Sequence, residues 1–254
     1  MTAGLRGLLP ETRFAPSFEE RLTKPLPAAP AKAFDYAAKV TGGFPMADND
    51  SIGDCTIAGW VHLCQLAYAL VGVPYTYPGD DAVAAAYWEL VGHGPEYEGD
   101  PGPGLQMTQV LSAASAGAGL LGVKAVAWGS VNIHSKAALR NALYNFGALY
   151  LAGDIPQDAE TQFPGWWHLV SGAHPGVGGH CFVASGDLDL GSFAGLDNIT
   201  WGGENGFTWP WWTRYSVSAF VVIPECYVTA GHGPLDAVDV AALEADVHGF
   251  AASA

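Results

Sequence analysis

The sequence predicts an α+β protein in which helices fill the first half of the chain and strands fill the second. Apolar residues recur at helical spacing between residues 55 and 118. Between residues 124 and 223, short apolar runs alternate with segments rich in glycine and proline. The two kinds of segment do not alternate along the chain, so a parallel βαβ arrangement is disfavoured and an antiparallel sheet is expected.

Three helices are expected in the first half, at residues 55–71, 80–91 and 106–118. Asp54 stands where an N-cap is needed for the first helix, and Gly72 follows it as a stop signal. The second helix opens on two aspartates, which favour the positive end of the helix dipole.

The second half is expected to hold six strands, at residues 124–128, 148–152, 181–185, 196–201, 207–212 and 219–223. A short helix at 135–146 separates the first two strands, and a long loop covers 156–179. The segment GGENG at 202–206 is typical of a hairpin turn. A last helix is expected at 236–247.

These elements suggest one domain over residues 46–226, with a helical lobe at about 46–120 and a β lobe at about 121–226. Residues 1–45 are rich in proline and alanine and are expected to form an extended arm around that domain. Residues 227–254 form a tail that carries the last helix.

Composition restricts the function classes that this chain can belong to. It has 254 residues with 10 Lys and Arg against 25 Asp and Glu, for a formal net charge of −15. Such a charge repels phosphates, so nucleic acids and anionic membranes are disfavoured as partners. Half of the residues are hydrophobic and 14% are charged, which indicates a packed core rather than disorder.

The N-terminus lacks the apolar run of a secretory signal, so we expect a cytoplasmic protein. The most apolar stretch, 111–131, is made mostly of small residues and is too weakly apolar to be a membrane span. Four cysteines in a chain of this length do not form a disulfide framework, and most of them are expected to be buried thiols.

Cys55 differs from the other cysteines because it stands at the expected start of a helix, directly after Gly53 and Asp54. A helix N-terminus favours the thiolate and lowers the pKa of a cysteine there. The alternative is a small apolar residue that opens the helix.

A histidine and an asparagine follow Cys55 by 125 and 143 residues. His180 opens an expected strand after a glycine-rich loop, and Asn198 lies in the next strand. A Cys–His–Asn site of the papain type places the last two about 130–150 residues after the cysteine. An asparagine can orient the imidazole as a carboxylate does in other triads.

Three segments resemble the papain-like cysteine peptidase superfamily: NDSIGDCTIAGW (49–60), GGHCFVASG (178–186) and NITWGGENGF (198–207). They are most similar to a divergent, uncharacterised branch found in tailed phages and bacteria. The resemblance covers about residues 44–225 and implies a two-lobe fold, with a helical lobe that delivers Cys55 and a β lobe that delivers His180. It also implies that Trp201 shields the hydrogen bond of His180.

The chain departs from the pattern of this superfamily at two positions. Where the family has the glutamine of its oxyanion hole, this chain has Asn49, a shorter side chain with the same amide donor. Alignment on Trp201 puts Ile199 at the family's asparagine, so Asn198 fits only with a one-residue shift. Asp197, on the same face as Ile199, is the other polar candidate.

The resemblance implies hydrolysis of an amide bond by Cys55, His180, Asn198 and Asn49, without a cofactor or metal. The expected substrate is a peptide or protein, and the acidic chain suggests a neutral or basic one. An alternative is a weakly active or inactive papain-like protein that serves as a structural or interaction component, for example in a phage virion, with the N-terminal arm contacting an assembly partner.

Two other patterns suggest binding sites. His168, His174 and His180 recur every six residues next to Cys181, which would allow zinc but matches no common zinc motif. The tryptophans at 166–167 and 209–212 could form a platform for a sugar or peptide, although such residues more often belong to a core.

Overall fold

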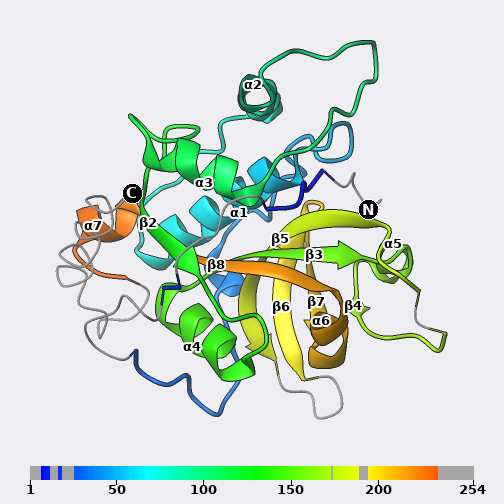
Figure 1. Cartoon of the computed structure of the whole chain (residues 1–254). Coiled ribbons are helices and arrows are strands. Elements are labelled where there is room, and N and C mark those ends of the chain that lie inside the picture. Colours follow the sequence, from blue (N-terminus) through cyan, green and yellow to red (C-terminus); the bar gives the residue numbers. More distant parts are fainter. Residues whose placement is uncertain (1–6, 12–16, 19–25, 173, 189–193, 234–254) are drawn as a thin grey trace.

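The computed structural model describes residues 7–11, 17–18, 26–172, 174–188 and 194–233. Its helices and strands form one sheet with helices on both faces, and α1, α2 and α3 are grouped on one side of it (Figure 1). The helix predicted at 236–247 lies outside the described residues. In the described part of the chain, none of the helices is long and apolar enough to cross a membrane.

The helices of the first half are α1 (Cys55–Leu70), α2 (Asp80–Val91) and α3 (Met107–Ser115), preceded by a 3₁₀ turn, η2 (Ala37–Lys39). In the described part of the second half, the helices are α4 (Lys136–Phe146), α5 (Asp158–Gln162), α6 (Trp209–Tyr215) and α7 (Glu225–Ala230). The strands among the described residues are β1 (Phe34–Asp35), β2 (Ala125–Ser130), β3 (Leu149–Ile155), β4 (Trp166–Trp167), β5 (Gly178–Leu188), β6 (Gly195–Thr200), β7 (Gly203–Thr208) and β8 (Ser216–Pro224).

The strands lie in the order β2-β8-β3-β5-β6-β7-β4, with β1 paired to β5. Every neighbouring pair is antiparallel except β4 and β7. This arrangement confirms the predicted fold class, α+β with an antiparallel sheet. The central strand β5 has the largest role, because α1 packs against it and both β3 and β6 pair with it.

The local signals in the sequence place most elements to within a few residues. Ser135 caps α4 by accepting a hydrogen bond from the N–H of Ala138, and Gly147 ends that helix in the left-handed conformation. Three expectations were wrong. The segment 202–206 is not a five-residue turn, because β7 begins at Gly203, and residues 209–212 form the start of α6 instead of a strand. The segment 156–179 is not one long loop, because it contains α5, β4 and the start of β5.

Two hydrophobic cores lie on opposite faces of the sheet. On one face, α1 and α3 pack over side chains such as Tyr150, Cys181 and Ile199. On the other face, α4 and α6 cover a core that includes Phe182 and five tryptophans. Because side chains alternate along β5, His180 and Cys181 point to different faces, as the sequence predicts.

Candidate active site

Cys55 is the first residue of α1, where the sequence predicts it. The helix packs against β5, and Cys181, the residue after His180, directs its backbone N–H toward the Cys55 sulfur. The fold therefore brings the two segments that carry Cys55 and His180 together at one end of α1.

The Cys55 thiol is fully buried, and burial is the largest influence on its protonation. Burial raises the pKa of Cys55 to about 12, and the nearby Asp54 carboxyl raises it further, while backbone N–H groups of Cys181, Gly7 and Thr56 lower it. The helix N-terminus thus does not yield a thiolate in this arrangement. The physical reason is that no water reaches the sulfur.

A segment of the N-terminal arm, residues 7–11, covers Cys55, and we call it the strap. The Gly7 N–H donates a hydrogen bond to Cys55 Sγ at 3.3 Å. The next residue, Leu8, donates its N–H to the carbonyl of Gly179 at 3.2 Å. The strap therefore contacts both the nucleophile candidate and the residue that precedes His180.

The other side of the strap pairs with Leu105, in the loop that leads to α3. Leu9 donates its N–H to the Leu105 carbonyl at 2.9 Å, and the Leu105 N–H donates to the Gly7 carbonyl at 2.7 Å. These bonds form a parallel bridge between Leu8 and Leu105. The strap is thus held as an extended strand between the two segments that flank Cys55.

Two glycines, Gly7 and Gly104, allow the strap to lie this close. A Cβ atom on Gly7 would stand 1.5 Å from the carbonyl oxygen of Gly53, and a Cβ on Gly104 would stand 2.1 Å from the carbonyl oxygen of Gly7. Both contacts are to backbone atoms, which cannot rotate away as a side chain can. No other residue type fits at the crossing point.

Glu11 fixes the end of the strap to the N-terminus of α3. One carboxylate oxygen accepts the N–H of Met107 at 2.7 Å and the N–H of Thr108 at 3.3 Å. The other accepts the Thr108 hydroxyl at 2.5 Å. A carboxylate at this position also interacts favourably with the positive end of the helix dipole.

His180 is fully buried near the start of β5 and contacts Thr200 at the end of β6. Its Nε2 lies 2.6 Å from the hydroxyl oxygen of Thr200. The Trp201 ring packs against the imidazole, with ring centroids 4.7 Å apart. The Phe182 ring also lies near the imidazole, with ring centroids 6.1 Å apart. Trp201 therefore covers the imidazole at the place where the resemblance implies a shield.

The structure does not bring Asn198 to His180. Asn198 pairs with Ala184 in the register of β5 and β6, four positions beyond His180 and so about 13 Å away along the strand. Both polar atoms of its amide are buried and have no hydrogen-bond partner among the described residues. The hydrogen bond expected from Asn198 is made by Thr200, which the sequence analysis did not consider.

Asp197, the other polar candidate, is directed away from His180, into a group of carboxylates. Burial, followed by Asp35, Glu204 and Asp187, raises the pKa of Asp197 to about 7. Its alternation with Thr200 along β6 places it on the opposite face of the sheet. It is therefore not placed to orient the imidazole.

Asn49 lies beside the N-terminus of α1, as the resemblance implies. Its amide nitrogen donates to Asp54 Oδ1 at 3.1 Å and to the Ile52 carbonyl at 3.4 Å. In this arrangement Asn49 therefore orients Asp54, and its use as an oxyanion donor stays a prediction. The sequence contains no signal for the Asn49–Asp54 contact other than the short distance between them.

Asp54 precedes Cys55 and is fully buried. It is the N-cap residue of α1, although its side chain makes no capping hydrogen bond. Burial raises the pKa of Asp54 well above its ordinary value, and the Asn49 hydrogen bond lowers it by less. The Oδ2 atom is buried and has no partner among the described residues.

The raised pKa of Asp54 predicts a pH-dependent stability. The folded state binds a proton at Asp54 that the unfolded state has already released, so the free energy of unfolding falls as pH rises from about 4 toward the folded pKa. The slope for one such group reaches about 1.4 kcal/mol per pH unit. Urea unfolding from pH 4 to 8 should show a smaller fall for Asp54→Asn, and parallel curves for the two proteins would contradict this account.

The structure does not gather the residues of the alternative zinc site. His174 pairs with Asp158 at 3.0 Å, and His168 contacts the Trp166 carbonyl at 2.8 Å. Within the described ranges, no three His, Cys, Asp or Glu side chains lie close enough together to hold a metal ion. Most of the tryptophans considered as a binding platform are buried in the core to which α6 contributes, namely Trp167, Trp209, Trp211 and Trp212.

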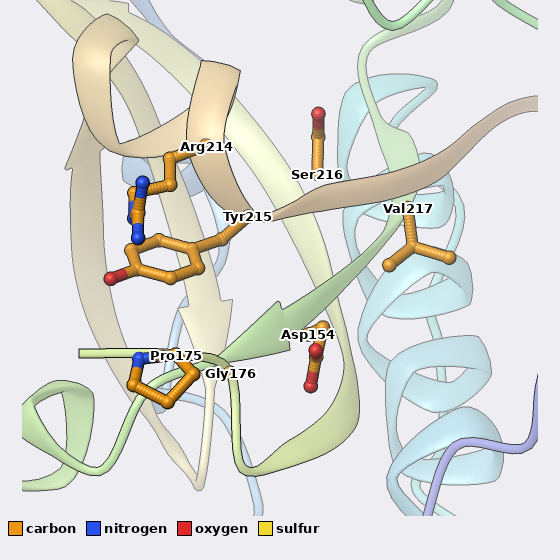
Figure 2. Close-up of a pocket in the computed structure, with 7 residues that line it drawn as sticks. All are labelled: Asp154, Pro175, Gly176, Arg214, Tyr215, Ser216 and Val217. Atoms are coloured by element: carbon orange, nitrogen blue, oxygen red, sulfur yellow. The ribbon is translucent and has the colours of Figure 1, made fainter. Parts of the chain in front are cut away.

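An open cavity of about 310 Å³ lies between the end of β3 and the start of β8. Figure 2 shows Asp154 and Arg214 among its lining side chains, together with the ring of Tyr215. Asp154 pairs with Gly179, whose carbonyl binds the strap. The cavity is thus one strand away from the segment that leads into His180.

The chain matches no family model and no curated protein by sequence. Its structure is similar to xylellain, a cysteine protease from Xylella fastidiosa, with a TM-score of 0.60 at 13% identity, over 87% of this chain and 97% of that one. It is also similar to procathepsin B S9 from Trypanosoma congolense, with a TM-score of 0.57 at 13% identity, over 87% of each chain.

A third similar structure is digestive procathepsin L 3 from the larval midgut of Tenebrio molitor, with a TM-score of 0.55 at 10% identity. That match covers 87% of this chain and 75% of the other. These neighbours are papain-like cysteine proteases. The likeness and the sheet topology together show that this chain has the papain-like two-lobe α+β fold.

Proposed function

We propose that this protein is a cysteine-dependent hydrolase, a peptidase or amidase, in which Cys55 is the nucleophile and His180 the general base. The observation that carries the proposal is the position of Cys55 at the N-terminus of α1, beside the start of β5, in a fold shared with cysteine proteases. We also propose that the chain belongs to the branch found in tailed phages and bacteria, and this assignment rests on the three sequence motifs.

The reaction begins when Cys55 Sγ transfers its proton to His180 and attacks the carbonyl carbon of an amide. The negative charge on the carbonyl oxygen is stabilised by N–H groups at the start of α1, with Asn49 as the side-chain donor once its amide turns from Asp54. The C–N bond then breaks, and His180 gives its proton to the leaving amine. Water, deprotonated by His180, hydrolyses the thioester and restores the thiol.

The proposed substrate is a peptide or protein segment of neutral or basic character. The net charge of −15 and the exposed Asp154 carboxylate beside the cavity favour it electrostatically. Leu105 and Gly179 already bind a peptide backbone in the strap, and a substrate could use the same carbonyl and N–H groups after the strap has left.

The strap supports a second candidate function. Gly7 covers Cys55, and burial raises the pKa of the thiol to about 12, so a substrate reaches the sulfur only after the strap has moved. A protein that never releases the strap would act as a structural or interaction component, for example in a virion. The arm would then contact a partner through residues outside the strap.

An activity assay separates the two functions. Cys55→Ala should reduce hydrolysis of casein or a peptide library to background, because no other described cysteine lies at the start of α1. Cys226→Ala removes an equally buried thiol far along the chain and should leave the activity unchanged. Far-UV circular dichroism confirms that both variants fold. Equal activity in Cys55→Ala and the parent would exclude the proposed mechanism.

A further inference from the structure

The hydroxyl of Thr200 occupies the position beside His180 Nε2 at which a Cys–His site needs its third member. The distance between the two atoms is 2.6 Å, and both side chains are buried, with 0% of His180 and 2% of Thr200 exposed. A hydrogen bond between buried groups has no competing water, so it fixes the plane of the imidazole.

We infer that Thr200 is the positioning residue that orients His180 for proton transfer, an inference that rests on the proposed function. When Thr200 Oγ1 accepts a hydrogen bond from Nε2–H, the lone pair of the imidazole is on Nδ1. Nδ1 is then the atom that accepts the proton of Cys55. When the ring becomes an imidazolium, Nε2 keeps its proton and the hydrogen bond to Thr200 persists.

The strand context makes the threonine a rigid partner. Thr200 is the last residue of β6, and the chain turns immediately afterwards at Trp201, which has a positive φ of 46°. A β-branched side chain in a strand has restricted χ1 rotation, so the hydroxyl keeps its direction. The Trp201 ring against the imidazole excludes water from the same contact.

A neutral hydroxyl stabilises the imidazolium less than a carboxylate does, because it contributes a dipole rather than a full charge. Thr200 therefore selects the tautomer and the orientation of His180 without placing a charge beside it. This chemistry predicts an effect on the pH profile of the Cys55–His180 pair, which a merely structural threonine would not produce.

The test compares the pH dependence of Cys55 alkylation by iodoacetamide in a background whose strap is displaced by Gly7→Val. Thr200→Val keeps the shape and removes the hydroxyl, and it should slow alkylation near pH 6 by about tenfold. Thr200→Ser restores the hydroxyl and should recover most of the rate. Thr208→Val removes another buried hydroxyl of the β lobe and should leave the profile unchanged.

Histidine spectra and two further variants distinguish a failure of this inference from a failure of the proposed function. Histidine ¹⁵N spectra should show the Nε2–H tautomer at His180 in the parent and a mixture in Thr200→Val, independently of any activity. The inference is overturned if Thr200→Val matches the parent at every pH, or if Asn198→Ala shifts the profile and Thr200→Val does not. If His180→Gln also leaves the profile unchanged, the proposed function itself fails.

Discussion

Replacing Gly7 with valine is expected to uncover Cys55 and to raise its alkylation rate at neutral pH by about a hundredfold. A side chain at this position cannot fit, because its Cβ would overlap the Gly53 carbonyl oxygen. Displacement breaks three backbone hydrogen bonds of the strap, which contribute about 1 kcal/mol each. Together they contribute about 3 kcal/mol, which corresponds to the predicted hundredfold rise in the alkylation rate.

The measurement is the rate of iodoacetamide labelling at Cys55, followed by mass spectrometry of the intact protein and its peptides. Gly94→Val is a matched control, because a Cβ there meets no atom within 4 Å. Truncation of residues 1–11 should reproduce the effect of Gly7→Val. If both changes leave Cys55 as slow as Cys64 and Cys181, something other than the strap protects the thiol, and the account of the covered site is wrong.

The Trp167→Ala variant is expected to lose about 3–5 kcal/mol of unfolding free energy. Trp167 is fully buried, with ring centroids 4.8 Å from Trp211 and 5.2 Å from Phe182. Its indole N–H also donates to the Ala159 carbonyl at 3.0 Å, so the alanine variant leaves a cavity and loses this hydrogen bond.

Urea unfolding measures this loss. Tyr97→Ala, at a residue that is 63% exposed, should change the unfolding free energy by less than about 0.5 kcal/mol. A loss below about 1 kcal/mol in Trp167→Ala would contradict the assignment of Trp167 to the core and would revive the platform of aromatic side chains. These measurements distinguish a core residue from a ligand-binding residue, because the loss of a core side chain lowers the unfolding free energy even without a ligand.

The sequence predicts the helix that carries Cys55 and the strand that carries His180, because both depend on local signals. The cap position of Asp54, the apolar spacing of α1 and the glycines before β5 act over a few residues. The fold brings this helix and this strand together, and the spacing of the three motifs along the chain indicates that fold.

The identity of the third residue could not be predicted, because it depends on the register between β5 and β6. The segment 202–206 is typical of a turn, but the chain reverses earlier, at Trp201 and Gly202. That reversal puts Thr200 beside His180 and Asn198 beyond its reach. A shift of two residues along a strand keeps the same face, so alternation alone cannot distinguish the two.

The strap and α6 were missed for different reasons. The strap is held by backbone groups of Gly179 and Leu105, far away in the sequence, and residues 1–45 carry no periodic pattern. The segment Trp209–Tyr215 has the aromatic composition of a strand, although Pro210 in its first turn is a helix-start signal that the sequence analysis did not use.

The most direct test of the central claim is the pH profile of Cys55 alkylation in the Gly7→Val variant, with and without His180→Gln. Where Cys55 and His180 form a thiolate–imidazolium pair, alkylation should remain fast well below the ordinary cysteine pKa of about 8.5, and His180→Gln should move the profile up to that value. Identical profiles with and without His180 would contradict the claim that these two residues form a catalytic pair.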